Sequence, residues 1–357
     1  MDRDRIGATE ARDDRAPDAA RRAAANTALL DMLYAFELTR AICAAAELGI
    51  ADLLGGGPRT VEELAADTGT RPALLYRLLR ALASRGIFEQ LPDGRRFALT
   101  ELAEPLRREG PGGTVHDYAL YVGQPFLQRS WEHLVPTLRT GRPAFELAHE
   151  TPLFEYLAAN PSAAQSFNDA MSSHSGRDAD AVIEAYDFAA GHTIVDVAGG
   201  HGTLIAKILS AVPGASGVLF DLPQVIEGAR ETLRAAGVAD RCRLIEGNMF
   251  ESVPPGGDIY TLKRALHDWS DEQAVAILRN CRAAIGEEGR VVVIEMVVDP
   301  GPEGHLAKFY DLMMMVVASG RERTEAEYGE LLHAAGLRLA RTIPTLGPLS
   351  VIEGVGA

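Results

Sequence analysis

The apolar positions in the first part of the chain recur every three or four residues. This spacing runs from Ala25 to about Leu54 and predicts a long helix. Its apolar face is wide, which is typical of a helix that packs against something large, such as a second subunit. The apolar positions are Leu29, Leu30, Met32, Leu33, Phe36, Leu38, Ile42, Ala45, Leu48 and Ile50.

The next segment carries the signals of two short helices and a strand hairpin. Thr60 followed by Glu63 fits a capping box, Gly69 ends a helix, and Pro72 suits a first helical turn. A Pro-Asp-Gly sequence at 92–94 is typical of a tight turn between two strands. Together these elements predict a winged helix.

Many winged helices bind DNA, so the charge of this segment decides between two roles. Residues 59–109 carry nine basic and eight acidic side chains. A DNA reader would show a clear basic excess, because it must neutralise phosphates. The sequence therefore favours a structural or dimerisation role.

Residues 113–186 predict several helices with short breaks, and beyond them the hydrophobic period changes to that of strands. Five apolar strands follow, and each of the first four precedes a helical stretch, which predicts a mostly parallel, doubly wound α/β sheet. A terminal hairpin at 339–345 and 349–353 adds an antiparallel strand at one edge. The five strands are expected at 193–197, 217–221, 242–246, 258–266 and 291–295.

Length, charge and cysteine usage narrow the choice of function. The 357 residues favour two domains, and a net charge of −15 disfavours nucleic acid and anionic membranes as partners. No apolar stretch reaches the ~18 residues that a membrane span needs. The 3 widely spaced cysteines predict free thiols in a reducing, cytoplasmic compartment. Residues 1–24 mix Asp, Glu and Arg and predict a disordered leader.

The strongest local motif is D-V-A-G-G-H-G at 196–202, directly after a predicted strand. Backbone can approach a ligand closely at its glycines, which are Gly199, Gly200 and Gly202. The dinucleotide fingerprint fails, because Ile205 stands where a third glycine or alanine is needed. Asp221 ends the next strand, where a carboxylate can accept both hydroxyl hydrogens of a ribose. A plain turn and a solvated carboxylate are the alternatives.

Two further strand ends carry candidate chemistry. Asn248, Met249 and Phe250 would suit an adenine, with an amide for the ring edge and apolar side chains for its face, although such apolar pairs are more often core. The fourth strand runs into L-K-R-A-L-H-D-W-S-D-E-Q at 262–273, which puts Lys263 and then a histidine at its end.

In this order, these segments resemble the S-adenosylmethionine-dependent O-methyltransferases of small-molecule metabolism, the family of plant caffeate-type and bacterial antibiotic and polyketide tailoring enzymes. The resemblance covers nearly all of the chain after the leader. It rests on D-V-A-G-G-H-G, L-F-D-L-P, G-N-M-F, L-K-R-A-L-H-D-W-S-D, V-I-E and G-R-E-R-T-E-A-E-Y. It implies a Rossmann-like methyltransferase domain at 187–357, a helical connector at 113–186 beside the acceptor pocket, and a winged-helix dimerisation domain at 25–112. A homodimer follows from that domain.

The resemblance also implies a site without a metal. Its catalytic base is His267, flanked by the acids Glu295 and Glu322, and Met171 matches a position near the methyl acceptor. The implied contacts to S-adenosylmethionine are Asp196, Gly199, Gly200, Gly202, Asp221, Asn248, Met249, Phe250 and Lys263.

The implied reaction is methyl transfer to a hydroxyl, expected on a phenol of a secondary metabolite. A phenol has a pKa near ~10 and is mostly protonated at neutral pH, whereas a histidine with a pKa near ~6.5 can accept its proton. A carboxylate from Glu295 or Glu322 would fix the imidazole tautomer; taken alone, both are ordinary solvated carboxylates. The alternatives are the same fold with altered chemistry, such as hydroxylation or ring closure, and a winged-helix regulator that senses a small molecule.

Some positions stay open. Asp268 either caps the next helix or touches substrate, while Ser270 with Gln273 fits a capping box for a helix over 274–281. The family has Gly and Asp where this chain has Ala198 and Asn248; Ala198 is tolerated only at negative φ, and Asn248 predicts weaker cofactor affinity. Candidate apolar walls of the acceptor pocket, each equally suited to a core, are Phe126, Trp131, Met171, Phe309 and Met313.

Overall fold

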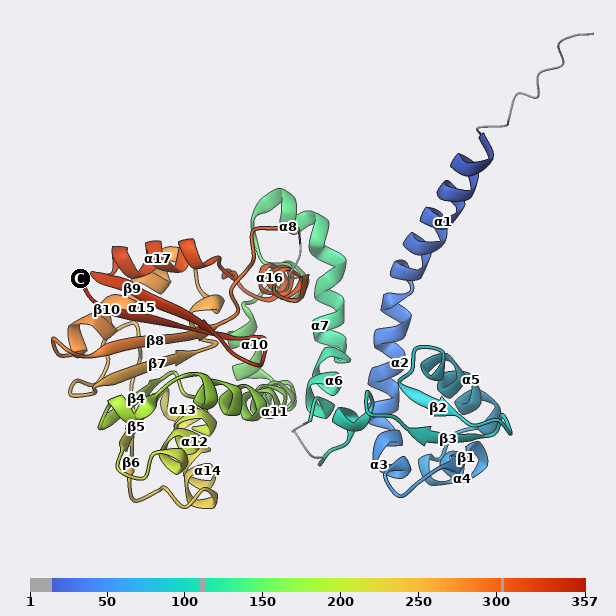
Figure 1. Ribbon diagram of the computed structural model, residues 1–357, viewed down its shortest axis with the longest axis horizontal. Helices are drawn as coiled ribbons and strands as arrows, with labels where there is room; N and C mark the ends of the chain where they lie inside the picture. The colour runs from blue at the N-terminus through green and yellow to red at the C-terminus, as the bar shows by residue number, and fades with distance from the viewer. Residues whose placement is uncertain (1–14, 110–113, 303–304) are drawn as a thin grey trace, which may run out of the picture.

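The computed structural model describes residues 15–109, 114–302 and 305–357, which form a small N-terminal domain, a helical connector and a larger α/β domain (Figure 1). The first helix, α1 (Arg15–Leu33), projects away from the rest of the molecule (Figure 1). No helix in these described ranges is long and apolar enough to cross a membrane. Cys43, Cys242 and Cys281 are free and buried, as predicted.

The N-terminal domain is a winged helix. Its local signals are present: Thr60 and Glu63 form the capping box, Gly69 ends its helix at φ +63°, and Pro72 begins the next. The three short strands pair in the order β1-β3-β2. The elements are α1 (Arg15–Leu33), α2 (Ala35–Glu47), α3 (Ile50–Leu54), β1 (Arg59–Thr60), α4 (Val61–Thr68), α5 (Pro72–Ala83), β2 (Phe88–Gln90) and β3 (Arg96–Leu99).

The predicted first helix differs from the structure in two ways. It begins at Arg15, inside the expected disordered leader, because the Ala- and Arg-rich stretch after it has high helix propensity. It is also divided into α1, α2 and α3, with a break at Tyr34 and a left-handed Gly49. The rest of the leader, residues 1–14, lies outside the described residues.

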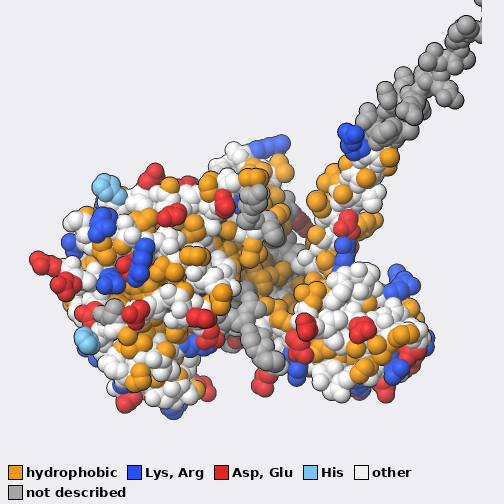
Figure 2. Space-filling view, viewed as in Figure 1, with side chains coloured by type: hydrophobic (Ala, Val, Ile, Leu, Met, Phe, Trp, Pro, Cys, Tyr) orange, Lys and Arg blue, Asp and Glu red, His pale blue; other side chains and the backbone are white. Residues whose placement is uncertain are grey.

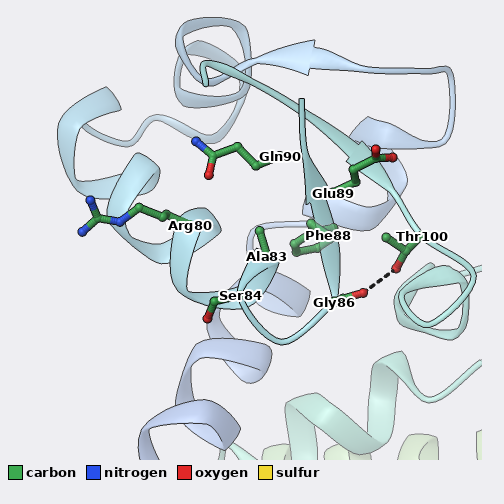
Figure 3. Close-up of a pocket in the computed structure, with 8 residues that line it drawn as sticks. All are labelled: Arg80, Ala83, Ser84, Gly86, Phe88, Glu89, Gln90 and Thr100. Atoms are coloured by element: carbon green, nitrogen blue, oxygen red, sulfur yellow. Dashed lines mark hydrogen bonds between the residues drawn. The ribbon is translucent and has the colours of Figure 1, made fainter. Parts of the chain in front are cut away.

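A pocket of this domain lies between α5 and the strand that follows it (Figure 3). Thr100 Oγ1 donates a hydrogen bond of 3.0 Å to the carbonyl of Gly86 at its rim. None of the candidate site residues lines it.

The connector is a set of short helices followed by one long helix. Together with α16 (His305–Val317) they enclose an aromatic cluster that contains Tyr121, Phe126 and Phe145. The elements are α6 (His116–Val122), α7 (Pro125–Ser130), η2 (Trp131–His133), α8 (Leu134–Thr140), α9 (Ala144–His149), α10 (Leu153–Ala159) and α11 (Pro161–Ala185). The short helix η1 (Glu104–Leu106) precedes them and packs in the core of the N-terminal domain.

The α/β domain has a seven-stranded sheet in the order β6-β5-β4-β7-β8-β10-β9. The first five strands of this order are parallel, and β10 is antiparallel to both neighbours, which confirms the predicted fold class. The strands are β4 (Thr193–Val197), β5 (Ser216–Asp221), β6 (Cys242–Glu246), β7 (Ile259–Lys263), β8 (Arg290–Glu295), β9 (Leu337–Pro344) and β10 (Ser350–Gly356).

Helices cover both faces of this sheet. One core contains α11, α12 and α14, and the other contains α15 and α17. The remaining elements are η3 (Phe188–Ala190), α12 (Thr203–Ala211), α13 (Pro223–Ile226), α14 (Ala229–Ala235), η4 (Leu266–Asp268), α15 (Asp271–Ala284) and α17 (Glu325–Ala334).

Two expectations about this domain were wrong in detail. No helix follows β6, because residues 247–258 contain two prolines and three glycines, which disfavour one. The fourth strand ends at Lys263 rather than at 266, since Arg264 has φ +50° and leaves the extended conformation.

Candidate active site

The candidate site lies at the carboxyl edge of the parallel strands. From β4 the chain goes to β5 and β6 on one side and returns to β7 and β8 on the other, so the β4–β7 junction is a topological switch point. The glycine loop follows β4, while Asp221, Lys263 and Glu295 end β5, β7 and β8. The predicted groups therefore meet at one edge.

The glycine loop needs its glycines for space and for backbone conformation. A Cβ on Gly199 would lie 2.3 Å from Leu219 Cδ1, and Gly202 caps α12 at φ +76°. The amide of Gly200 donates 2.8 Å to Asp221 Oδ2, and the amide of Leu222 donates 2.7 Å to Oδ1. The carboxylate is thus fixed against the loop and keeps lone pairs for a ligand.

Ala198 contradicts the expectation of negative φ, because its φ is +54°. A non-glycine residue in this region costs roughly 1–2 kcal/mol. Its amide still donates 2.8 Å to the carbonyl of Phe220, so the sheet holds the strained residue in place.

Replacing Ala198 with glycine is expected to stabilise the protein by about 1 kcal/mol, because glycine adopts positive φ without the Cβ clash. Chemical denaturation measures this directly. Ala236→Gly is the matched control: Ala236 is exposed at φ −78°, where glycine lowers the free energy of unfolding by about 0.5–1 kcal/mol. Equal destabilisation by both variants would contradict the strain.

Two carboxylates beside the loop have raised pKa values. Burial raises the pKa of Asp196 to about 6, against a 2.7 Å hydrogen bond from Thr261 that lowers it. Burial also raises the pKa of Asp221, against the bonds from Gly200 and Leu222. Asp196 Oδ2 is buried without a hydrogen-bond partner.

The segment after β6 is held by the side-chain amide of Asn248. Asn248 Oδ1 accepts 3.0 Å from the amide of Phe250, and Asn280 donates 2.8 Å to the carbonyl of Met249. Phe250 packs edge-on against Trp269 at 4.8 Å. The predicted adenine contacts thus form a folded turn beside the η4 segment.

His267 lies in the short helix η4 and is 5% exposed. Its Nδ1 is 2.7 Å from Glu322 Oε1 and 3.4 Å from Glu295 Oε2. Its Nε2 lies 3.8 Å from Asp268 Oδ1, and Tyr310 stacks on the ring at 6.1 Å. Because Glu322 occupies Nδ1, Nε2 is the nitrogen left to accept a proton.

The charges around His267 make it a strong base. Burial lowers its pKa, but Glu295, Asp268 and Glu322 outweigh burial and raise the pKa to about 9. Burial raises the pKa of Asp268 to about 6, although His267 opposes this. Burial likewise raises the pKa of Glu295, with His267 opposing.

The side chains of His267, Glu295 and Glu322 could also hold a metal ion, since their donor atoms lie within 4.8 Å of one another. The 2.7 Å between His267 Nδ1 and Glu322 Oε1 fits a shared proton better. Two ligands of a tetrahedral zinc ion, with bonds of about 2.0–2.2 Å, lie about 3.3 Å apart. The geometry therefore favours a hydrogen-bonded triad.

The two glutamates have different tasks that the sequence left open. Glu322 Oε1 bonds the imidazole at Nδ1, whereas Glu295 Oε1 accepts hydrogen bonds of 2.9 Å from the amides of Ala265 and Leu266. Asp268 does not cap α15, because Ser270 and Gln273 form the capping box there, as predicted. The carboxylate of Asp268 faces Nε2 of His267 instead.

Arg264 lies beside the candidate site and was not a candidate from the sequence. It pairs with buried Asp178 at 3.0 Å and lies over the Tyr310 ring at 5.2 Å. Its Nη1 and Nη2 are buried without hydrogen-bond partners. Burial, and then Arg264, lower the pKa of neighbouring Lys263 to about 8. The adjacent cationic side chains of Lys263 and Arg264 at the end of a strand were the sequence signal that could have identified Arg264.

The structure brings together only part of the expected apolar wall. Phe126, Met171 and Met313 belong to the aromatic cluster under α16. Trp131 and Phe309 are not part of this cluster, and their side chains are 37% and 67% exposed. Helical spacing alone could not tell which side of α16 Phe309 would take.

The two family models that match this chain follow the same division. The model of the O-methyltransferase domain matches residues 131–338, and that of the O-methyltransferase dimerisation domain matches residues 30–108. The phenazine O-methyltransferase PhzM of Lysobacter antibioticus is 40% identical over 325 residues, which are 91% of this chain and 94% of that protein. The mitomycin biosynthesis 6-O-methyltransferase of Streptomyces lavendulae is 40% identical over 338 residues, covering 94% and 96%.

A solved structure extends the similarity to a liganded protein. The O-methyltransferase NcsB1 from neocarzinostatin biosynthesis, in complex with S-adenosylmethionine and 2-hydroxy-5-methyl naphthoic acid, has a TM-score of 0.74 and 34% identity, covering 90% of this chain and 96% of that one. With both domains matched and the relatives aligned over nearly their whole length, the chain belongs to the S-adenosylmethionine-dependent O-methyltransferase family.

Proposed function

We propose that this enzyme methylates a phenolic hydroxyl of a small aromatic secondary metabolite, with His267 as the general base. The observation that carries the proposal is the 2.7 Å contact of Glu322 with Nδ1, which leaves Nε2 to accept the proton. Met171 and Met313 are only partly buried against the aromatic cluster, and their apolar side chains suit an apolar acceptor. A ligand of a relative, 2-hydroxy-5-methyl naphthoic acid, has this chemistry.

The residues at the strand ends fit the cofactor. Asp221 keeps lone pairs for ribose hydroxyls, and Asn248 and Met249 lie after the neighbouring strand for the adenine. Arg264 offers two buried, unpartnered nitrogens, which suit the carboxylate of the cofactor's methionine part. Bound S-adenosylmethionine supplies an activated methyl group on a sulfonium.

The chain itself positions the acceptor and takes its proton. A pKa of about 9 for His267 lies close to the ~10 of a phenol, so proton transfer between them costs little. Glu322 stabilises the imidazolium that forms. The Tyr310 ring lies nearly parallel to the imidazole, at 6.1 Å between ring centroids.

A homodimer is part of the proposal. Large apolar side chains of α1 and the start of α2 are exposed, and orange side chains line this projecting helix in Figure 2. Such a stripe is unusual on a monomer and suits a subunit contact. It overlaps the start of the matched dimerisation domain. The exposed residues are Leu29, Leu30, Met32, Leu33, Tyr34 and Phe36.

The test combines catalysis with cofactor binding. Purified protein is incubated with methyl-labelled S-adenosylmethionine and panels of phenols and of aromatic amines. Labelled methyl ethers, formed in step with S-adenosylhomocysteine, are expected. Transfer only to amines would contradict the phenolic acceptor, and a product without S-adenosylhomocysteine would indicate altered chemistry.

Asp221→Asn is expected to weaken binding of S-adenosylmethionine by about 10–100-fold, because hydrogen bonds to a charged group contribute about 1.5–3 kcal/mol. Titration calorimetry measures the Kd. Asp240→Asn is the control, since Asp240 is exposed in the loop before β6. An unchanged Kd for Asp221→Asn would remove this carboxylate from the cofactor site.

A further inference from the structure

The main chain that carries His267 is held from both sides by buried charged side chains. Glu295 Oε1 accepts from the amides of Ala265 and Leu266 at 2.9 Å and from that of His267 at 3.4 Å. Arg323 holds the carbonyls: its Nη1 donates 3.2 Å to Leu266 and its Nη2 donates 2.9 Å to Trp269. The carboxylate of Glu295 accepts hydrogen bonds from the amides of this turn, and the guanidinium of Arg323 donates hydrogen bonds to its carbonyls.

Arg323 is itself fixed in place. It is 0% exposed, and its Nε donates 2.9 Å to Asp271 Oδ1 at the start of α15. Its carbonyl accepts 2.9 Å from the amide of Val298, beyond the end of β8. The preceding residue, Glu322, binds His267 Nδ1. Two neighbouring residues thus hold the imidazole and the backbone beneath it.

We infer that Arg323 is a positioning residue for catalysis, which together with Glu295 fixes the η4 turn so that Nε2 of His267 meets the acceptor. This inference rests on the proposed role of His267. A buried guanidinium is costly to desolvate, and apolar side chains of similar size often stabilise a fold as well or better. The guanidinium of Arg323 donates hydrogen bonds to the carbonyls of Leu266 and Trp269, at the two ends of the turn, and to the carbonyl of Arg321.

Loss of the Arg323 side chain is expected to affect the reaction rate but not cofactor binding. None of the hydrogen bonds described for Arg323 reaches the glycine loop or Asp221. Loss of the guanidinium should therefore shift the base without weakening cofactor binding. A misplacement of about 1 Å at a reacting group can cost about 10²-fold in rate.

Arg323→Lys tests this, because lysine keeps the charge but cannot span both carbonyls and Asp271. The matched control is Arg321→Lys: Arg321 pairs with the same Asp271 at 2.7 Å, but it is 46% exposed and its side chain binds no carbonyl of the turn. We expect kcat to fall by about 10²-fold in Arg323→Lys and to stay at the wild-type value in Arg321→Lys. The Kd of S-adenosylmethionine should be unchanged in both variants. Wild-type kcat, or a parallel loss of cofactor affinity, would overturn the inference.

The double variant with His267→Ala separates the two hypotheses. If Arg323 acts through the histidine, Arg323→Lys has little further effect once His267 is alanine. Additive losses would show a different role for Arg323. Undiminished activity of the single variant His267→Ala would instead refute the proposed base. Asp271→Ala, which removes the acceptor of the Nε hydrogen bond and keeps the charges of Arg323 and Glu295, should give a smaller fall in kcat than Arg323→Lys but a larger one than Arg321→Lys. A kcat equal to that of Arg321→Lys would count against positioning.

Discussion

Replacing His267 with alanine is expected to lower kcat by about 10²–10⁴-fold, the usual range for loss of a general base. Cofactor affinity should stay the same, because Asp221 and the glycine loop, which we propose to hold the cofactor, lie at other strand ends. Transfer of labelled methyl to the best phenol of the panel gives kcat. His333→Ala is the control, since His333 is exposed in the last turn of α17.

The pH dependence identifies the group that is lost. General-base catalysis needs neutral His267, and with a pKa of about 9 only about 1% is neutral at pH 7. In the wild type, kcat/KM should therefore rise with pH up to about 9, and this dependence should vanish in His267→Ala. A wild-type profile that is already flat above pH 7 would contradict the raised pKa.

The same shift affects stability with a defined sign. The folded state raises the pKa of His267 from 6.5 to about 9, so it favours the protonated form. This stabilisation is fully present below about pH 6.5 and is lost as the pH rises through about 9. His267→Ala should lack that component. Catalysis and stability therefore make opposite demands on this proton.

Features that depend on neighbouring residues could be predicted from the sequence. The capping boxes at Thr60 and Ser270 and the left-handed Gly69 are present, because each involves residues within about one turn. The meeting of Asp221 and Lys263 at one edge was predictable as well, since parallel strands bring their carboxyl ends together.

Features that depend on tertiary packing could not be predicted. Glu295 and Glu322 were equivalent candidates in the sequence, and only the packing of β8 and of the segment before α17 against η4 assigns one to amides and the other to Nδ1. The positive φ of Ala198 is likewise imposed from outside, by the hydrogen bond of its amide to β5. Local propensity favours the opposite sign of φ there.

At Gly320 the backbone of the segment before Glu322 approaches the η4 turn so closely that no side chain fits between them. A Cβ on Gly320 would lie 1.9 Å from the carbonyl oxygen of His267, 2.4 Å from Asp268 C and 2.5 Å from Trp269 N. These atoms are backbone, so no side-chain rotation relieves the clash. Either the turn or the Glu322 segment must move.

Gly320→Ala is therefore expected to lower kcat by about 10²-fold and to cost about 1–3 kcal/mol of stability, as overpacking does elsewhere. The Kd of S-adenosylmethionine should not change, because the displaced atoms do not belong to the glycine loop. Gly286→Ala is the control, since a Cβ there meets nothing within 4 Å. Denaturation curves, cofactor titration and kcat measured on both variants separate the effects. If Gly320→Ala lost stability but kept its kcat, the turn would tolerate displacement, and the tight hold of Glu295 and Arg323 on its backbone would serve the fold rather than the base.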